Sequence, residues 1–152
     1  NYGAEVFLYT DASGCIAQRT ICRSLLMFPS FIGPNSGQVP ANAQILSATL
    51  EFVITDSGGT QYAYQLTESW AEPTVAWNSF ATPGLPTTKG SPVSFAAPKG
   101  TIVITITAFV QNWVNGDANL GIFIMSPSTN GVDYRSSESA VTPKLTVTYQ
   151  LA

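Results

Sequence analysis

The sequence predicts an all-β domain, a jelly-roll-like β-sandwich of two antiparallel sheets with one short helix. Three observations lead to this prediction. Apolar and β-branched residues alternate with polar ones in several short segments, turn residues separate these segments at short intervals, and only one segment has a helical pattern. The chain has 152 residues, the size of one domain. We therefore expect a single sandwich domain over residues 1–152.

Two strands are predicted near the N-terminus, at residues 5–10 and 20–28, around a Gly-containing connection. Cys15 and Cys22 flank this connection. A disulfide between them would close a short loop, contribute roughly 2–3 kcal/mol in the chain-entropy model, and indicate an oxidising compartment. The alternative is two independent buried thiols. A zinc site is disfavoured because the chain has no His and no second Cys pair.

A loop rich in Pro and Gly over residues 29–40 precedes the longest predicted strand, at 44–55. Alternation predicts that one face of this strand is apolar, formed by Leu46, Ala48, Leu50, Phe52 and Ile54. The Asp-Ser-Gly-Gly sequence at 56–59 then predicts a hairpin with a second strand at 61–66.

The Pro-rich stretch over residues 69–100 has room only for short strands, which we expect near 74–77 and 93–95. Alternating Ile residues predict a strand at 101–107. Residues 108–114 form the single predicted helix, because Phe109, Val110 and Trp113 make one apolar stripe, with Thr107 as its N-cap. The last predicted strands are 120–125 and 144–151.

Charged residues make up only 10% of the chain, against about 25% in typical domains. The six Lys and Arg residues are scattered, and nucleic-acid binding requires clustered cations, so we expect no nucleic-acid partner. No apolar run approaches the ~18 residues that span a bilayer, which argues against membrane insertion. Low charge favours an extracellular, secreted or cell-surface domain.

Six motifs along the chain carry a family resemblance. They are Arg-Ser-Leu-Leu-Met-Phe at 23–28, Ile-Leu-Ser-Ala-Thr-Leu at 45–50, Leu-Thr-Glu-Ser-Trp at 66–70, Thr-Val-Ala-Trp-Asn at 74–78, Ile-Thr-Ala-Phe-Val-Gln-Asn-Trp at 106–113 and Pro-Lys-Leu-Thr-Val-Thr-Tyr at 143–149. The chain thereby resembles the DNRLRE-type domain, which is close to the carbohydrate-binding modules that accompany polysaccharide lyases and to disaggregatase-related domains.

The resemblance implies a β-sandwich that acts as a non-catalytic extracellular module for adhesion or targeting. Its partner would be a polysaccharide or another cell-surface polymer. Some relatives bind alginate, but the scarcity of cations in this chain argues against an acidic polysaccharide.

Relatives usually carry one more strand before the Asn-Tyr-Gly sequence that here stands at residues 1–3. A sandwich without this strand has an open N-terminal edge. Either the domain is a piece of a larger extracellular protein whose own strand covers the edge, or another segment fills the gap. A different class of function is the alternative: a structural protomer of a filament or surface layer, in which neighbouring copies add a strand.

Catalysis is not expected. The chain has no His, so it lacks the usual base of a Ser or Cys nucleophile. Paired carboxylates for glycoside hydrolysis remain conceivable, and Glu68 and Glu72 are the closest in sequence. Glu68, however, lies in a segment that the resembled family uses structurally.

Aromatic side chains are the candidate ligand-binding residues. The resemblance places Trp70, Trp77 and Trp113 in the core or at element ends, so we expect core roles rather than sugar stacking. Tyrosines tolerate partial exposure and are the preferred platform candidates: Tyr2, Tyr9, Tyr62, Tyr64 and Tyr134. Asp117 and Asn119 lie in a polar loop that would suit a structural calcium ion, although a plain turn is the alternative. We expect no other cofactor.

Overall fold

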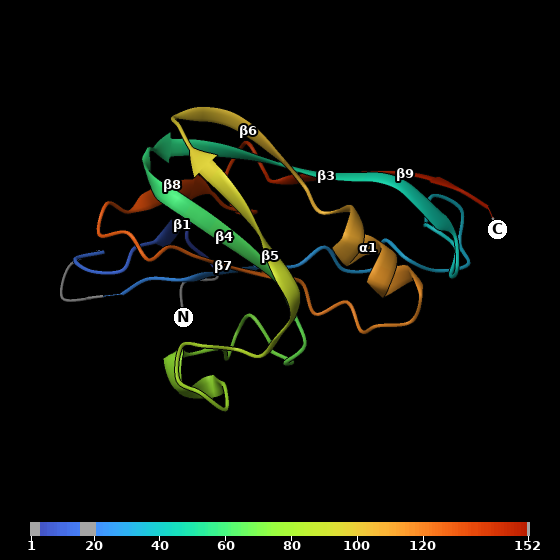
Figure 1. Cartoon of the computed structure of the whole chain (residues 1–152), viewed down its shortest axis with the longest axis horizontal. Helices are drawn as coiled ribbons and strands as arrows, with labels where there is room; N and C mark the ends of the chain where they lie inside the picture. Colours follow the sequence, from blue (N-terminus) through green and yellow to red (C-terminus); the bar gives the residue numbers. More distant parts are fainter. Residues whose placement is uncertain (1–3, 16–20, 152) are drawn as a thin grey trace.

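The computed structural model describes residues 4–15 and 21–151. Figure 1 shows its two antiparallel sheets. The elements are β1 (Phe7–Thr10), β2 (Ser24–Leu26), β3 (Gln44–Asp56), β4 (Gly58–Leu66), the 3₁₀ helix η1 (Trp77–Ser79), β5 (Thr88–Ala97), β6 (Gly100–Thr105), α1 (Thr107–Val114), β7 (Ile122–Met125), β8 (Val132–Arg135) and β9 (Lys144–Gln150). The predicted all-β sandwich with one short helix is confirmed.

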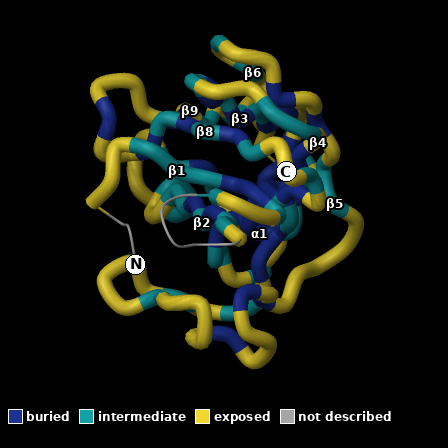
Figure 2. Tube along the Cα trace, turned by 90° about the vertical axis from the view of Figure 1, so that its left-hand side faces the viewer, coloured by how far each residue is buried: buried dark blue, intermediate teal, exposed yellow. Residues whose placement is uncertain are grey.

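The five-stranded sheet has the order β1-β8-β3-β6, with β9 paired to β3, and the four-stranded sheet has the order β2-β7-β4-β5. Their inner faces meet around Phe52, whose ring centroid lies 6.3 Å from that of Phe95 and 5.5 Å from that of Tyr134. Figure 2 shows the buried segments inside, with exposed residues in the outer loops. This core fixes the two outer faces on which a site can form.

The predicted apolar face of β3 holds over most of the strand but not at its start. Ile45 is buried, at 6% exposure, whereas Leu46 is 52% exposed. The pairing of β3 with β9 shifts by one residue between Ile45 and Ser47, as at a β-bulge. A one-residue shift exchanges the two faces of a strand, so the prediction that Leu46 faces inward was wrong.

The predicted hairpin of residues 44–55 and 61–66 was also wrong. β3 and β4 follow one another directly but belong to different sheets, so the chain crosses from one sheet to the other. The two glycines serve close packing here. A Cβ on Gly58 would come within 2.1 Å of the carbonyl oxygen of Gly131, and one on Gly59 within 2.2 Å of the Ser128 Cβ.

Helix α1 begins one residue before the predicted range, and Ile106 rather than Thr107 is its N-cap. The Thr107 hydroxyl instead accepts a hydrogen bond from the Ala48 N–H on β3 (3.0 Å). The helix therefore docks on β3 through a side chain that sequence reasoning assigned to capping. No described helix combines the length and apolarity required to cross a lipid bilayer.

The Pro-rich stretch differs from its prediction in two places. Residues 74–77 form turns and the start of η1 rather than a strand, because the N–H groups of Thr74 and Val75 both bond to the carbonyl of Ala71. The expected short strand at 93–95 is instead the middle of β5, which tolerates Pro92 as an edge strand.

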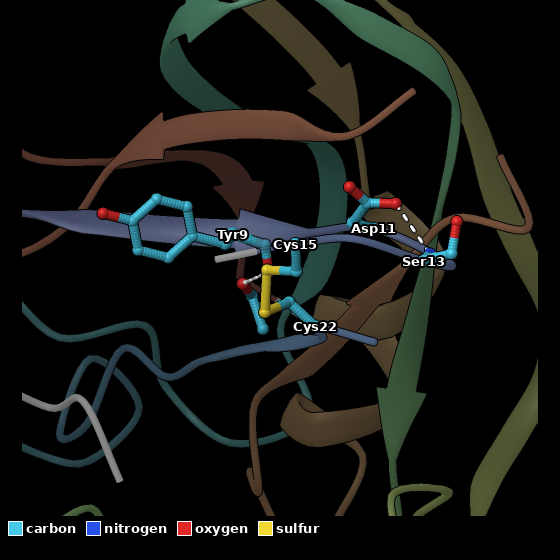
Figure 3. The surroundings of a disulfide bond; sticks show 6 residues. Tyr9, Asp11, Ser13, Cys15 and Cys22 are labelled. Carbon is cyan, nitrogen blue, oxygen red and sulfur yellow. Dashed lines mark hydrogen bonds between the residues drawn. A yellow bond between two sulfur atoms is a disulfide. The ribbon is translucent and has the colours of Figure 1, made fainter. Parts of the chain in front are cut away.

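The disulfide between Cys15 and Cys22 is confirmed, with Cα atoms 5.8 Å apart (Figure 3). Beside it, Asp11 and Cys22 exchange two backbone hydrogen bonds of 3.0 Å, and the Ser24 hydroxyl donates to the carbonyl of Tyr9 (2.8 Å). The edge of β1 that faces away from β8 is thus partly occupied by residues 22–24. The open N-terminal edge expected from a missing strand stays a prediction.

Candidate functional site

The loop over residues 67–87 joins β4 to β5 and is the main feature outside the sandwich (Figure 1). Glu68 holds its two ends together. One carboxylate oxygen accepts the N–H of Ala81 (2.7 Å) and the other accepts the N–H of Thr87 (2.9 Å). These backbone hydrogen bonds hold the pKa of Glu68 below its usual value. Glu68 is therefore a structural anchor, as the family resemblance implied.

A cleft of about 360 Å³ separates this loop from β2 and from β1. Trp70, Trp77 and Phe80 line it from the loop, while Leu25 and Phe123 line it from the four-stranded sheet. A concave surface with mostly apolar and aromatic lining is typical of a small-molecule or polymer site. The lining also includes polar side chains, among them Arg23 and Glu72.

Trp77 is the most exposed aromatic side chain of the cleft, at 44% exposure. Gly84 fixes its position. The Gly84 N–H donates to the Trp77 carbonyl (2.7 Å), and a Cβ on Gly84 would come within 2.3 Å of the indole ring. Gly84 also has a positive φ of 69°, which favours glycine. The ring therefore rests against the backbone of its own loop.

Arg23 joins β2 to the same loop. Its guanidinium carbon lies 5.1 Å from the centroid of the Trp77 ring, and its Nη1 donates to the carbonyl oxygen of Gly84. Partial burial lowers the pKa of Arg23, but a guanidinium stays protonated at any physiological pH. Arg23 has five N–H donors, so one hydrogen bond to Gly84 leaves donors for a bound molecule. The mutual contacts of Arg23, Trp77 and Gly84 hold the Trp77 ring in one orientation.

The three tryptophans have different surroundings. Trp113 is buried in the core at 3% exposure, which confirms its predicted role. Trp70 is half-buried, and its Nε1 donates to the carbonyl of Leu120 (2.8 Å). The prediction of a core position was wrong for Trp77, because its loop lies outside both sheets.

The tyrosine candidates also differ in location and burial. Tyr9 lies half-buried on β1 and lines the cleft, where burial, followed by the charges of Asp133 and Glu5, raises its pKa. Tyr134 is fully buried, and its hydroxyl donates to Gln61 Oε1 (2.8 Å). Its inward position on β8 rules it out as a half-exposed platform, so that candidate is corrected.

Tyr62 and Tyr64 are half-buried on β4 and do not line the cleft. They alternate with the buried residues Gln61, Ala63 and Gln65, so they lie on the outer face of the four-stranded sheet. Tyr2 lies outside the described residues. Of the five tyrosine candidates, the structure thus places Tyr9 at the cleft and Tyr62 and Tyr64 on the neighbouring sheet face.

Asp117 and Asn119 have partners within the protein. Asp117 Oδ2 accepts hydrogen bonds from Lys89 Nζ (2.6 Å) and Gln65 Nε2 (3.2 Å), and the Lys89 bond lowers the pKa of Asp117. The Asn119 side chain donates to the carbonyl of Phe28 (2.8 Å) and accepts from the Gly121 N–H. Within residues 4–15 and 21–151, no three His, Cys, Asp or Glu residues gather as a metal site. A structural calcium stays a prediction.

Sequence reasoning missed the grouping of Arg23, Trp77 and Gly84. One signal was available: the Pro-rich stretch over residues 69–100 had room for short strands only, and connections longer than ~12–15 residues are usually functional or disordered. The contact between Arg23 and this loop joins residues 61 positions apart, which no local pattern reveals.

A two-sheet sandwich with a fixed, exposed indole beside a loop-walled cleft defines a β-sandwich binding module. The profile of carbohydrate-binding module family 96 matches residues 1–149, and the chain belongs to this family. The resemblance to carbohydrate-binding modules is thereby confirmed, whereas the DNRLRE-type label, although related to this family, is not. Carbohydrate-binding modules are generally non-catalytic. None of the curated proteins matches the chain significantly.

Proposed function

We propose that this domain is a non-catalytic extracellular module that binds a polysaccharide, or another polymer bearing sugars, in the cleft beside Trp77. The exposed, fixed indole ring of Trp77 is the observation that carries the proposal. An indole presents a flat apolar face with a polar edge, which suits the C–H face of a sugar ring. Arg23 supplies N–H donors for sugar oxygens next to that ring.

The rigidity of the cleft also supports binding. Gly84 and Arg23 already hold the Trp77 ring, and Glu68 already closes the loop. A preordered site loses little side-chain freedom when its ligand binds, and this increases affinity. Because stacking rather than charge supplies the energy, we expect weak binding that changes little with salt concentration.

Two features favour an extracellular location. Structural disulfides persist in oxidising compartments, and this chain has one between Cys15 and Cys22. The low charge suits a surface module. A filament protomer joined by strand addition has less support, because residues 22–24 occupy part of the β1 edge. Sizing from micromolar to millimolar concentration, with electron microscopy, would detect such assembly.

Affinity electrophoresis tests the proposal, in gels that contain barley β-glucan, xylan, galactomannan or sodium alginate. We expect at least one polymer to retard the wild-type domain and Trp77→Ala to weaken binding about tenfold or more, as for an aromatic hot spot. Tyr149→Ala is the matched control, since Tyr149 is 38% exposed on β9 of the other sheet. Wild-type protein that no polymer retards, or Trp77→Ala protein that binds normally, would refute the proposal.

A further inference from the structure

An apolar row crosses the outer face of the four-stranded sheet. Leu25 on β2 pairs with Phe123 on β7, and Phe123 pairs with Tyr64 on β4. Side chains of directly paired antiparallel residues lie on one face with Cβ atoms ~4.5–5.5 Å apart. Leu25 and Phe123 line the cleft, whereas Tyr64 lies outside it. Tyr64 is therefore the next aromatic residue of this row beyond the cleft.

The Tyr64 ring is in contact with the wall of the cleft. Its centroid lies 6.1 Å from that of Phe123, at an interplanar angle of 41°. Phe123 is almost fully buried; it borders the cleft and its ring contacts the Tyr64 ring, so a single packed side chain separates Tyr64 from the cleft. This contact places Tyr64 directly beside the site of the proposed function.

A second row extends the surface along β4. Tyr62 pairs with Met125 on β7 and with Ser94 on β5. It stands two residues from Tyr64, so the two side chains share a face and their Cα atoms are ~6.8 Å apart. Both tyrosines are half-buried, which leaves part of each ring accessible. Neither row contains a charged side chain.

The outer face of the five-stranded sheet provides the contrast. At its centre, Thr49 on β3 is paired with Thr105 on β6 and Thr146 on β9. This row has hydroxyl and methyl groups but no aromatic ring. The five-stranded sheet contributes aromatic rings at its edge strand β1 instead, where Phe7 and Tyr9 also line the cleft.

From the contact of Tyr64 with the wall of the cleft, and resting on the proposed function, we propose that the binding site extends from the cleft onto Tyr64 and Tyr62. These two rings form a second subsite that takes further sugar rings of the same polysaccharide chain, in a stretch without charged groups. A polymer held at both subsites gains effective concentration at the second one. The affinity should therefore increase with oligosaccharide length.

The test uses isothermal titration calorimetry with two-unit and six-unit oligosaccharides of β-glucan, xylan, mannan and alginate. We expect the wild-type domain to bind a six-unit probe more tightly than its two-unit counterpart. Tyr64→Ala should weaken six-unit binding about tenfold, as for an aromatic anchor, with little change for the two-unit probe. Trp77→Ala should weaken the binding of both probes, and Tyr149→Ala should change neither.

Tyr64→Leu controls for a loss of stability, because leucine keeps an apolar side chain against Phe123 but has no ring on which a sugar can stack. It should melt like the wild type and still lose six-unit affinity. Equal wild-type affinity for short and long probes, or normal six-unit binding by Tyr64→Leu, would overturn this inference alone if Trp77→Ala still weakens the binding of both probes. Failure of every probe to bind the wild type would overturn both proposals.

Discussion

Trp113 and Trp77 show how differently one residue type is used in two regions of this domain. Trp113 lies on α1 at 3% exposure, with its ring centroid 6.2 Å from that of Phe31 and 6.5 Å from that of Phe109. Trp77 lies in the loop over 67–87 at 44% exposure, against Gly84 and beneath the guanidinium of Arg23.

The difference concerns what each ring does for the protein. The Trp113 ring is removed from water and packs against aromatic neighbours, so it stabilises the fold. Trp77 keeps nearly half its surface in water although its orientation is fixed. An apolar surface that is held in place but left exposed is typical of a binding site. The experiments below separate these two roles.

The largest expected effect is on stability at Trp113. Trp113→Ala should lower the free energy of unfolding by about 3–5 kcal/mol, as for other large-to-small changes in a core. Trp77→Ala should cost less than about 1 kcal/mol, because its ring is only partly removed from water. Urea unfolding followed by far-UV circular dichroism measures both. Similar losses for the two variants would remove the distinction between them.

The disulfide should have the next largest effect, because it fixes the segment that brings Arg23 to Trp77. The double variant Cys15→Ser, Cys22→Ser should lose about 2–3 kcal/mol in the chain-entropy model. Thermal melting of this variant and of wild-type protein treated with a dithiol should give matching shifts. Alkylation without reductant, followed by intact mass measurement, is the control, and two labelled thiols in native protein would contradict the structure.

The smallest effect concerns pH and the loop that carries Trp77. Backbone hydrogen bonds depress the pKa of Glu68 in the folded protein. The contribution of Glu68 to the stability of the folded loop is therefore complete above its unfolded pKa of about 4.3. It is lost as the pH falls through the lower pKa of the folded state. We expect the Trp77 fluorescence to change in this acid range while the sheets stay folded.

Glu68→Gln should remove this acid transition, because a carboxamide does not titrate. Glu138→Gln is the control, since Glu138 lies outside the loop and the lining of the cleft. Trp77→Phe should abolish the fluorescence change, which would assign the signal to Trp77 rather than to Trp70 or Trp113. An unchanged acid transition in Glu68→Gln would show that another group holds the loop.

Local patterns predicted β3, β4, β6 and β9 well because burial between two sheets imposes a period of two, as in β3 from Ala48 to Ile54, but they gave no strand at β8 and only the middle of β5. The patterns failed where a long-range contact decides the outcome. The bulge that exposes Leu46 depends on pairing with β9, and the crossing after Asp56 depends on the backbone at Gly131. Neither partner is close in sequence.

The candidate site was predicted less well for the same reason. Tyrosines on strands were preferred because tyrosine tolerates partial exposure, and Tyr9, Tyr62 and Tyr64 do lie half-buried. The choice of Tyr134 was wrong, because the sequence of a four-residue strand does not show which of its two faces is buried. Trp77 was assigned to the core because its exposure depends on a loop that folds against Arg23.

The anchoring of the loop by Glu68 has a consequence for evolution and design. Its hydrogen bonds join the beginning of the loop to Ala81 and to Thr87. Trp70, which bonds to Leu120, and the buried Phe80 hold the same part of the loop, so residues 71–79 are the segment that can vary in length and composition, and loops tolerate such change better than sheets do. Grafting different segments over residues 71–79 offers a direct route to new ligand preferences on an unchanged sandwich.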